Sequence, residues 1–282
     1  MKIYPKISIQ ETSNEMKEII KKSEGVELQF FDEKDITEEF NFENLIRKIK
    51  IEFDNLKEII VHPPLENYNM ELLTLKNKKI VENQLNKLVE LSKDLNIEIC
   101  IIYHTYWTKE QYRTTGLANI IKEYLKIIEN TKVTMLIENL FMMLDEGKEC
   151  SAIEICKFIN HPNLRACIDT THMHCKSNIY KKDFSKMIQE ELNKDDCQKY
   201  VRQIHFAAAL DGDGYIEKKR THGRKHPNYE SLKEELKWLK EFGMLDKNYI
   251  TEVSEEDYFT RVDQIEEIKM LEKAIKEVNK KS

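Results

Sequence analysis

The sequence predicts a single (β/α)₈ barrel, and three observations support this fold class. The chain has 282 residues, close to the roughly 250 that a closed α/β barrel needs. Short apolar, β-branched runs alternate with longer stretches of helical periodicity, which is typical of βα units around a parallel sheet. Only seven glycines and five prolines occur, and they are scattered, so no flexible linker divides the chain. We therefore expect one domain over residues 1–282.

Eight apolar runs are expected to form the strands, and eight is the number that closes such a barrel. In order they are Lys2–Ile9, Val26–Phe31, Glu58–Val61, Ile97–Tyr103, Val133–Ile137, Leu164–Ile168, Val201–Ile204 and Tyr249–Thr251. The clearest amphipathic helices between and after them are Glu71–Leu95, Glu230–Phe242 and Asp257–Lys281. The last of these can close the outer ring, and its exposed face could mediate a homodimer.

Composition narrows the partners that the chain can have. Hydrophobic residues make up 40% and charged residues 34%, with a formal net charge of −6, which predicts a soluble protein without a global positive field for nucleic acid. No apolar run approaches the roughly 18 residues that span a bilayer, so we expect no membrane partner and a cytoplasmic location. The six cysteines form no CxxC pair and are expected to be reduced and mostly structural.

Polar residues follow most of the later strands. In barrels of this kind the C-terminal ends of the strands open onto one face, where catalytic residues gather. A lone histidine or carboxylate in such a place is more often a helix cap or a solvated group, and His161 fits that ordinary case, whereas His174 and His226 stay open. Several carboxylates after apolar strands are different, because burying them is costly unless they are paired or bound to metal. The residues at these strand ends are His62, His104, Glu138, Asp169, His172, His205 and Glu252.

Four short segments carry a family resemblance. IEN at 137–139, DTTHMH at 169–174, the IH at 204–205 and TEV at 251–253 resemble the metal-ligand motifs of the xylose-isomerase-like barrels. That superfamily contains sugar isomerases, sugar epimerases and endonuclease IV. The resemblance extends from about His62 to the end of the chain, and its most specific piece is the DxxH motif. Residues 2–55 fit only as generic barrel.

Similarity to the sugar isomerases and epimerases implies one divalent ion, Mn²⁺, Zn²⁺ or Mg²⁺, in a site for a sugar or sugar phosphate. The ligands that it implies are Glu138, Asp169, His205 and Glu252. It also implies that Glu138 and Glu252 exchange the substrate proton and that His172 orients the substrate. The aromatic residues Trp107, Phe141 and Phe206 could wall the sugar, although core packing is the commoner fate of such residues.

Similarity to endonuclease IV implies instead a three-metal phosphodiester hydrolase that acts on abasic DNA. The additional ligands that it implies are His62, His104, His172 and His222. The family's Asp-x-His motif is broken, because this chain reads Arg220-Thr221-His222, so one ligand is missing unless Asp211 or Asp213 substitutes. Its Gly-Glu-Gly segment is also absent, and residues near His226 take its place.

A basic cluster precedes His226 and fits either substrate. Lys219, Arg220 and Arg224 are the candidates for binding a sugar phosphate or a DNA phosphate, unless the cluster is only a solvated loop. The acidic composition and the broken Asp-x-His motif favour the sugar substrate. A catalytically inactive binding barrel is disfavoured, because all four core ligands are present.

Overall fold

The computed structural model describes residues 2–8, 12–29, 42–63, 78–104, 117–139, 151–193, 195–208, 223–253 and 259–280. Its strands are β1 (Lys2–Tyr4), β2 (Lys6–Ser8), β3 (Gly25–Gln29), β4 (Glu58–His62), β5 (Glu98–His104), β6 (Val133–Glu138), β7 (Leu164–Asp169), β8 (Val201–Phe206) and β9 (Asn248–Thr251). Its helices are α1 (Asn14–Lys22), α2 (Phe42–Glu52), α3 (Lys78–Leu95), α5 (Leu117–Ile128), α6 (Ala152–Ile159), α7 (Thr170–Tyr180), α8 (Phe184–Leu192), α9 (Cys197–Tyr200), α10 (Tyr229–Glu241) and α11 (Val262–Lys280), with a 3₁₀ turn at Met244–Asp246.

The described strands form one parallel sheet that closes on itself. Its order is β1-β9-β8-β7-β6-β5-β4-β3-β2, so the two ends of the sheet are consecutive in the chain and meet at Pro5. The predicted barrel is confirmed, but the single strand expected at Lys2–Ile9 is split into β1 and β2. Proline has no N–H to donate to a ladder, and at this point only the Pro5 carbonyl bonds, accepting from Glu27 N at 3.0 Å. Ile9 lies outside the described residues.

The predicted helices are present in the structure, but some of their first and last residues differ from the predicted ones. α3 and α10 cover the described parts of their predicted ranges, and residues 64–77 lie outside the description. The last helix begins at Val262 rather than at Asp257, because residues 259–261 form a turn before it. Arg261 has φ 52°, a left-handed conformation that cannot extend a right-handed helix backwards.

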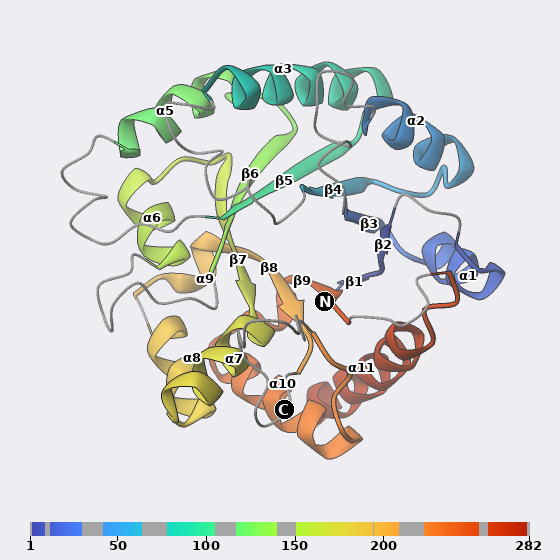
Figure 1. The fold of residues 1–282 in the computed structure, drawn as a ribbon, viewed down its shortest axis with the longest axis vertical. Coiled ribbons are helices and arrows are strands. Elements are labelled where there is room, and N and C mark those ends of the chain that lie inside the picture. The colour runs from blue at the N-terminus through green and yellow to red at the C-terminus, as the bar shows by residue number, and fades with distance from the viewer. Residues whose placement is uncertain are drawn as a thin grey trace.

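The helices surround the strands as an outer ring (Figure 1). The main core fills the space between ring and sheet, and in the described residues no helix combines the length and apolar character that crossing a bilayer requires. The cysteines in the described part of the chain, Cys100, Cys156, Cys167, Cys175 and Cys197, are buried and unbridged, which agrees with a structural role.

Inside the barrel an apolar layer lies between two polar layers. The inner apolar cluster consists of Tyr4, Ile60, Cys100, Ile102, Leu136, Cys167 and Ile250. Side chains alternate along a strand, so the neighbours two positions away also face inward. β4 therefore presents Glu58 below Ile60 and His62 above it. Gly25 lets the Tyr4 ring pack against β3, because a Cβ there would lie 2.4 Å from that ring.

Candidate metal centre

Four side chains converge at the C-terminal ends of successive strands. One ligand atom from each of Glu138, Asp169, His205 and Glu252 lies within 4.8 Å of the others, and all four residues are buried. β6 ends at Glu138 and β7 at Asp169, whereas His205 is the last residue but one of β8. The register of β7 and β8 pairs Asp169 directly with His205. The sequence selected these same four residues, and we call them the four-ligand group.

Inside the four-ligand group a hydrogen bond joins His205 Nδ1 and Glu138 Oε1 at 3.2 Å, and the other close contacts among these described residues are not hydrogen bonds. His205 Nδ1 lies 2.6 Å from Glu252 Oε2, yet that oxygen has no hydrogen-bond partner among the described residues. Asp169 Oδ2 and Glu138 Oε2 are buried acceptors in the same condition. Buried acceptors are almost always satisfied. Nitrogen and oxygen atoms that approach closely without hydrogen-bond geometry are arranged as ligands of a common cation would be.

A second set of potential metal ligands lies around the Oε2 atom of Glu138. His62, His104 and Glu138 are buried and have ligand atoms within 4.8 Å of one another; we call them the histidine group. Glu138 Oε2 lies 2.9 Å from His104 Nε2 and 3.5 Å from His62 Nε2. Neither ring nitrogen of His104 has a hydrogen-bond partner in the described part of the chain. His62 Nδ1 lies 3.0 Å from the Pro63 carbonyl, which assigns the proton to Nδ1 and the lone pair to Nε2.

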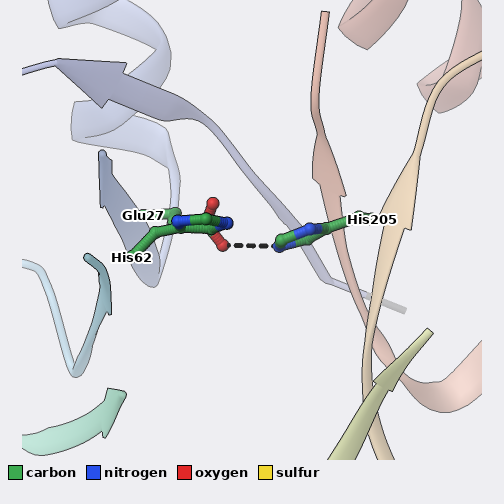
Figure 2. Close-up of side chains that lie close together, drawn as sticks. All are labelled: Glu27, His62 and His205. Atoms are coloured by element: carbon green, nitrogen blue, oxygen red, sulfur yellow. Dashed lines mark hydrogen bonds and ion pairs between the residues drawn. The ribbon is translucent and has the colours of Figure 1, made fainter. Parts of the chain in front are cut away.

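Two charged residues that sequence reasoning missed complete the floor of the site. Glu27 on β3 accepts a hydrogen bond from His205 Nε2 at 2.8 Å, and Figure 2 shows Glu27 beside His62 and joined to His205. This contact orients the His205 ring so that its Nδ1 faces Glu138 and Glu252. Burial opposes protonation of His205, but Cys167 and the surrounding carboxylates outweigh burial and raise the pKa of His205 well above its usual value. A carboxylate on the far nitrogen is the usual way that proteins orient a histidine ligand.

Lys6 on β2 is buried and forms ion pairs with both Glu252 and Glu27, the latter at 3.1 Å. It neutralises only part of the local charge. Burial opposes ionisation of Glu252, but Lys6 and His205 outweigh burial and hold the pKa of Glu252 well below its usual range. The signal in the sequence for both missed residues was a charge alternating with apolar residues inside a strand, as in VEL at 26–28.

Burial and the surrounding charges shift the pKa values of the other two carboxyl groups, Glu138 and Asp169, in opposite directions. Burial opposes ionisation of Glu138, yet His104 and His205 hold its pKa well below the ordinary value. Burial, reinforced by the like charges of Glu252 and Glu138, raises the pKa of Asp169 well above its ordinary value. Asp169 therefore ionises at a cost in the folded protein unless another cation compensates.

His172 lies beside both groups. Asp169 caps α7, with its Oδ1 accepting from His172 N at 3.1 Å. The His172 ring places Nδ1 2.6 Å from the Asn139 carbonyl and 3.3 Å from Asp169 Oδ2. The backbone of Asn139 thus positions the ring at the edge of the four-ligand group.

Other predicted site residues lie elsewhere. His226, which the sequence left open as an additional metal or substrate residue, is joined to Glu235 on α10 and Glu267 on α11. Phe206 does not wall the site, because it alternates with His205 and stacks outward on His226 at 4.9 Å. Arg224 pairs by its backbone with Ala208 just after β8. Candidates outside the described residues are Trp107, Phe141, Lys219, Arg220 and His222.

The donor chemistry fits divalent metal. Carboxylate oxygens and imidazole nitrogens are ligands for Zn²⁺ and Mn²⁺, and Mg²⁺ prefers oxygen alone. The unpartnered buried oxygens of Glu138, Asp169 and Glu252 are the positions at which a cation would fit, since buried charges are usually paired.

Comparison with known proteins gives the same architecture. A family model described as xylose isomerase-like TIM barrel matches residues 22–274. The fold is similar to a D-tagatose 3-epimerase-like protein (17% identity, TM-score 0.60, covering 100% of this chain and 99% of that chain). It is also similar to an IOLI protein with a binding zinc atom (15%, 0.63, 100% and 99%) and to endonuclease IV from Thermus thermophilus (12%, 0.57, 98% and 100%). No curated protein matches the chain.

Proposed function

Because the chain belongs to the xylose isomerase-like TIM barrel family, we propose that it is a divalent-metal-dependent enzyme whose centre holds two ions that share Glu138. We further propose that it hydrolyses a phosphate diester. The carrying observation is the division of the Glu138 carboxylate between two donor sets. Oε1 lies 3.2 Å from His205 Nδ1, whereas Oε2 lies 2.9 Å from His104 Nε2.

That division changes the ranking of the two functions that the sequence left open. A single ion held by the four-ligand group needs no further protein nitrogen, so under sugar chemistry the buried pair His62 and His104 would only support the ligands or contact substrate hydroxyl groups. Two ions bridged by one carboxylate are the usual arrangement of phosphodiesterases and nucleases. The histidine group therefore outweighs the acidic composition, which bears on how firmly a long nucleic acid binds rather than on the chemistry.

In the proposed reaction, bound divalent ions would lower the pKa of water and neutralise charge on the phosphate. The residues of the chain hold that arrangement in place. Glu27 keeps the His205 ring in one orientation, Asn139 keeps the His172 ring against Asp169, and Lys6 offsets the charge of Glu252. The nitrogen donors favour Zn²⁺ or Mn²⁺ over Mg²⁺.

Sugar isomerisation or epimerisation remains the second candidate. The observation in its favour is that the four-ligand group is complete by itself and contains two glutamates able to exchange a proton. Its substrate would be a small sugar or sugar phosphate, and Glu138 and Glu252 would be the acid and base.

The assay that separates these functions uses two substrate classes on the Zn²⁺- and Mn²⁺-loaded protein. A duplex with one abasic site and bis(p-nitrophenyl) phosphate test diester hydrolysis. A panel of ketoses and ketose phosphates in deuterated water tests proton exchange at carbon. We expect strand cleavage at the abasic site without deuterium incorporation. Deuterium exchange with no cleavage of either diester would transfer the proposal to sugar chemistry.

A double variant tests the two-ion centre itself. Replacing His62 and His104 by Asn should remove about one ion per chain together with hydrolysis, because two of the three donors of the histidine group are lost. His161→Asn is the matched control, since that histidine lies at the end of α6 and belongs to neither group. Unchanged metal content in the double variant would leave a one-ion centre.

A further inference from the structure

A second histidine and carboxylate cluster lies in the helical layer. His174 on α7, His226 after β8 and Glu235 on α10 each offer a ligand atom within 4.8 Å of the others. None of the three belongs to the four-ligand group or the histidine group. The cluster joins His174 to a pair of residues more than fifty positions later in the chain, and α10 and α7 both lie in the outer ring (Figure 1).

The donor atoms converge on one carboxylate oxygen. Glu235 Oε2 lies 2.9 Å from His174 Nε2 and 3.2 Å from His226 Nε2. Ligands of a tetrahedral zinc ion lie about 3.3 Å apart, given metal–ligand bonds of about 2.0 Å. The other carboxylate oxygen, Glu235 Oε1, is buried without a hydrogen-bond partner among the described residues.

Neighbouring side chains outside the cluster hold the rings of His226 and His174 in position. His226 Nδ1 lies 2.5 Å from Glu267 Oε1 on α11, and Glu267 Oε2 accepts from the His226 backbone N at 3.1 Å. A carboxylate on Nδ1 places the proton there and the lone pair on Nε2, as in a carboxylate–histidine–metal chain. Phe184 stacks on the His174 ring with centroids 3.5 Å apart.

The cluster also has the negative charge and the surface access that a metal site needs. The two carboxylates, Glu235 and Glu267, are almost fully buried. Burial opposes protonation of His226, but Glu235 and Glu267 outweigh burial and raise the pKa of His226 to about 9. A divalent ion held by the cluster would neutralise the same two carboxylates in place of that proton. His174 is 20% exposed, so an ion can reach the cluster from the surface. We propose that His174, His226 and Glu235 form a separate Zn²⁺-type site, with Glu267 as the positioning residue.

An ion at this outer site clamps α7 to α10. Asp169 caps the N-terminus of α7 and His172 lies in its first turn, so the clamp fixes the helix that positions both residues at the centre. The site is independent of the proposed reaction, because its ligands take no part in either group around Glu138.

The first test counts ions. Zn²⁺-loaded wild type and His174→Ala are dialysed against metal-free buffer and analysed for zinc, with circular dichroism as a folding check. We expect His174→Ala to hold about one ion fewer per chain and His161→Ala to match wild type. Equal zinc in wild type and His174→Ala would overturn the site and leave a hydrogen-bonded chain of Glu235, His226 and Glu267.

The second test looks for a new signal rather than a loss. In His174→Cys loaded with Co²⁺, a thiolate ligand at position 174 adds a sulfur-to-cobalt charge-transfer band beyond any seen in Co²⁺-loaded wild type. The wild-type reference is needed because Cys167 lies near Glu138 and His205. No added band in a folded His174→Cys protein would also overturn the proposal, whatever the activity of the centre at Glu138.

Discussion

At the N-terminal ends of the strands, Glu58 is surrounded by hydrogen-bond donors. At the C-terminal ends, Glu138 is surrounded by other carboxylates and by histidines that leave one of its oxygens without a hydrogen bond. Glu58 accepts from Tyr4 and Asn248 at 3.0 Å each and from Arg202 at 2.8 Å. One oxygen of Glu138 has no hydrogen-bond partner among the described residues. The two carboxylates sit in the same barrel interior, separated by one apolar layer.

This difference distinguishes the structural polar cluster around Glu58 from the proposed metal centre around Glu138. A buried carboxylate contributes to stability when its partners belong to the fold, as those of Glu58 do. In the described part of the chain the upper cluster instead gathers Glu27, Glu138, Asp169 and Glu252 with one lysine, Lys6, which pairs with Glu27 and Glu252. The proposed metal ions would neutralise the remaining charge. Removing a carboxylate should therefore have opposite consequences at the two ends.

The largest effect is expected from Glu138→Gln. The variant keeps the shape of the side chain but cannot bridge two ions, so turnover should fall by about 10³-fold, equivalent to about 4 kcal/mol of barrier. Steady-state kinetics with the active substrate and zinc analysis measure the two consequences together. Turnover within a factor of about ten of wild type would show that Glu138 is not at the reacting atoms.

At the lower end the large effect should be on stability. Glu58→Gln removes the charge that pairs with Arg202, and we expect the free energy of unfolding in urea to fall by about 2 kcal/mol. Metal content and turnover of the folded variant should stay at the wild-type level. A loss of metal in Glu58→Gln would contradict the claim that Glu58 stabilises the fold without taking part in metal binding.

Glu27→Gln sharpens the comparison at the upper end. Without the carboxylate on its Nε2, His205 is less firmly held as a ligand through Nδ1, and affinity for Zn²⁺ should weaken by about 10- to 100-fold. Competition with a chelator of known affinity measures this change, and Glu58→Gln supplies a carboxylate-to-amide control within the same barrel. Equal Zn²⁺ affinity in Glu27→Gln and wild type would make Glu27 a purely structural partner.

The smallest effect, of opposite sign, is expected from Asp169→Asn in metal-free protein. Asparagine can still cap α7, and it removes a carboxylate whose pKa is raised by burial and by Glu252 and Glu138. A raised folded pKa means that the stability contributed by protonated Asp169 is complete below the unfolded pKa of about 3.9 and is lost as pH rises. The metal-free variant should therefore be more stable than wild type by up to about 1 kcal/mol at neutral pH.

The pH dependence of that difference supplies the check. Urea unfolding of both metal-free proteins at pH 4 and pH 7 should show the advantage of Asp169→Asn growing with pH. An advantage that shrinks toward neutral pH would mean that the folded protein already compensates the Asp169 charge.

Much of this centre could be predicted from sequence because strand ends are easy to locate. Glu138, Asp169, His205 and Glu252 each end an apolar run, and parallel strands bring such ends to one face. Lys6 and Glu27 were missed because they lie within strands, where only the side-chain alternation shows that a charge faces inward. The split of the first strand at Pro5 hid that alternation further.

Other features depended on tertiary contacts that no local pattern carries. His226 follows β8 as the ligands do, but its partners Glu235 and Glu267 lie on helices that only packing brings together. The division of Glu138 between His104 and His205 also required coordinates, since the sequence places both histidines at strand ends without saying which carboxylate oxygen each one meets.

Anomalous scattering from crystals grown with Zn²⁺ tests the two-ion centre most directly. Data collected at the zinc edge should show two peaks that share Glu138. One is expected among His62, His104 and Glu138 Oε2, and the other among Asp169, His205, Glu252 and Glu138 Oε1. A single peak within the four-ligand group, with His62 and His104 bound to no ion, would contradict the account.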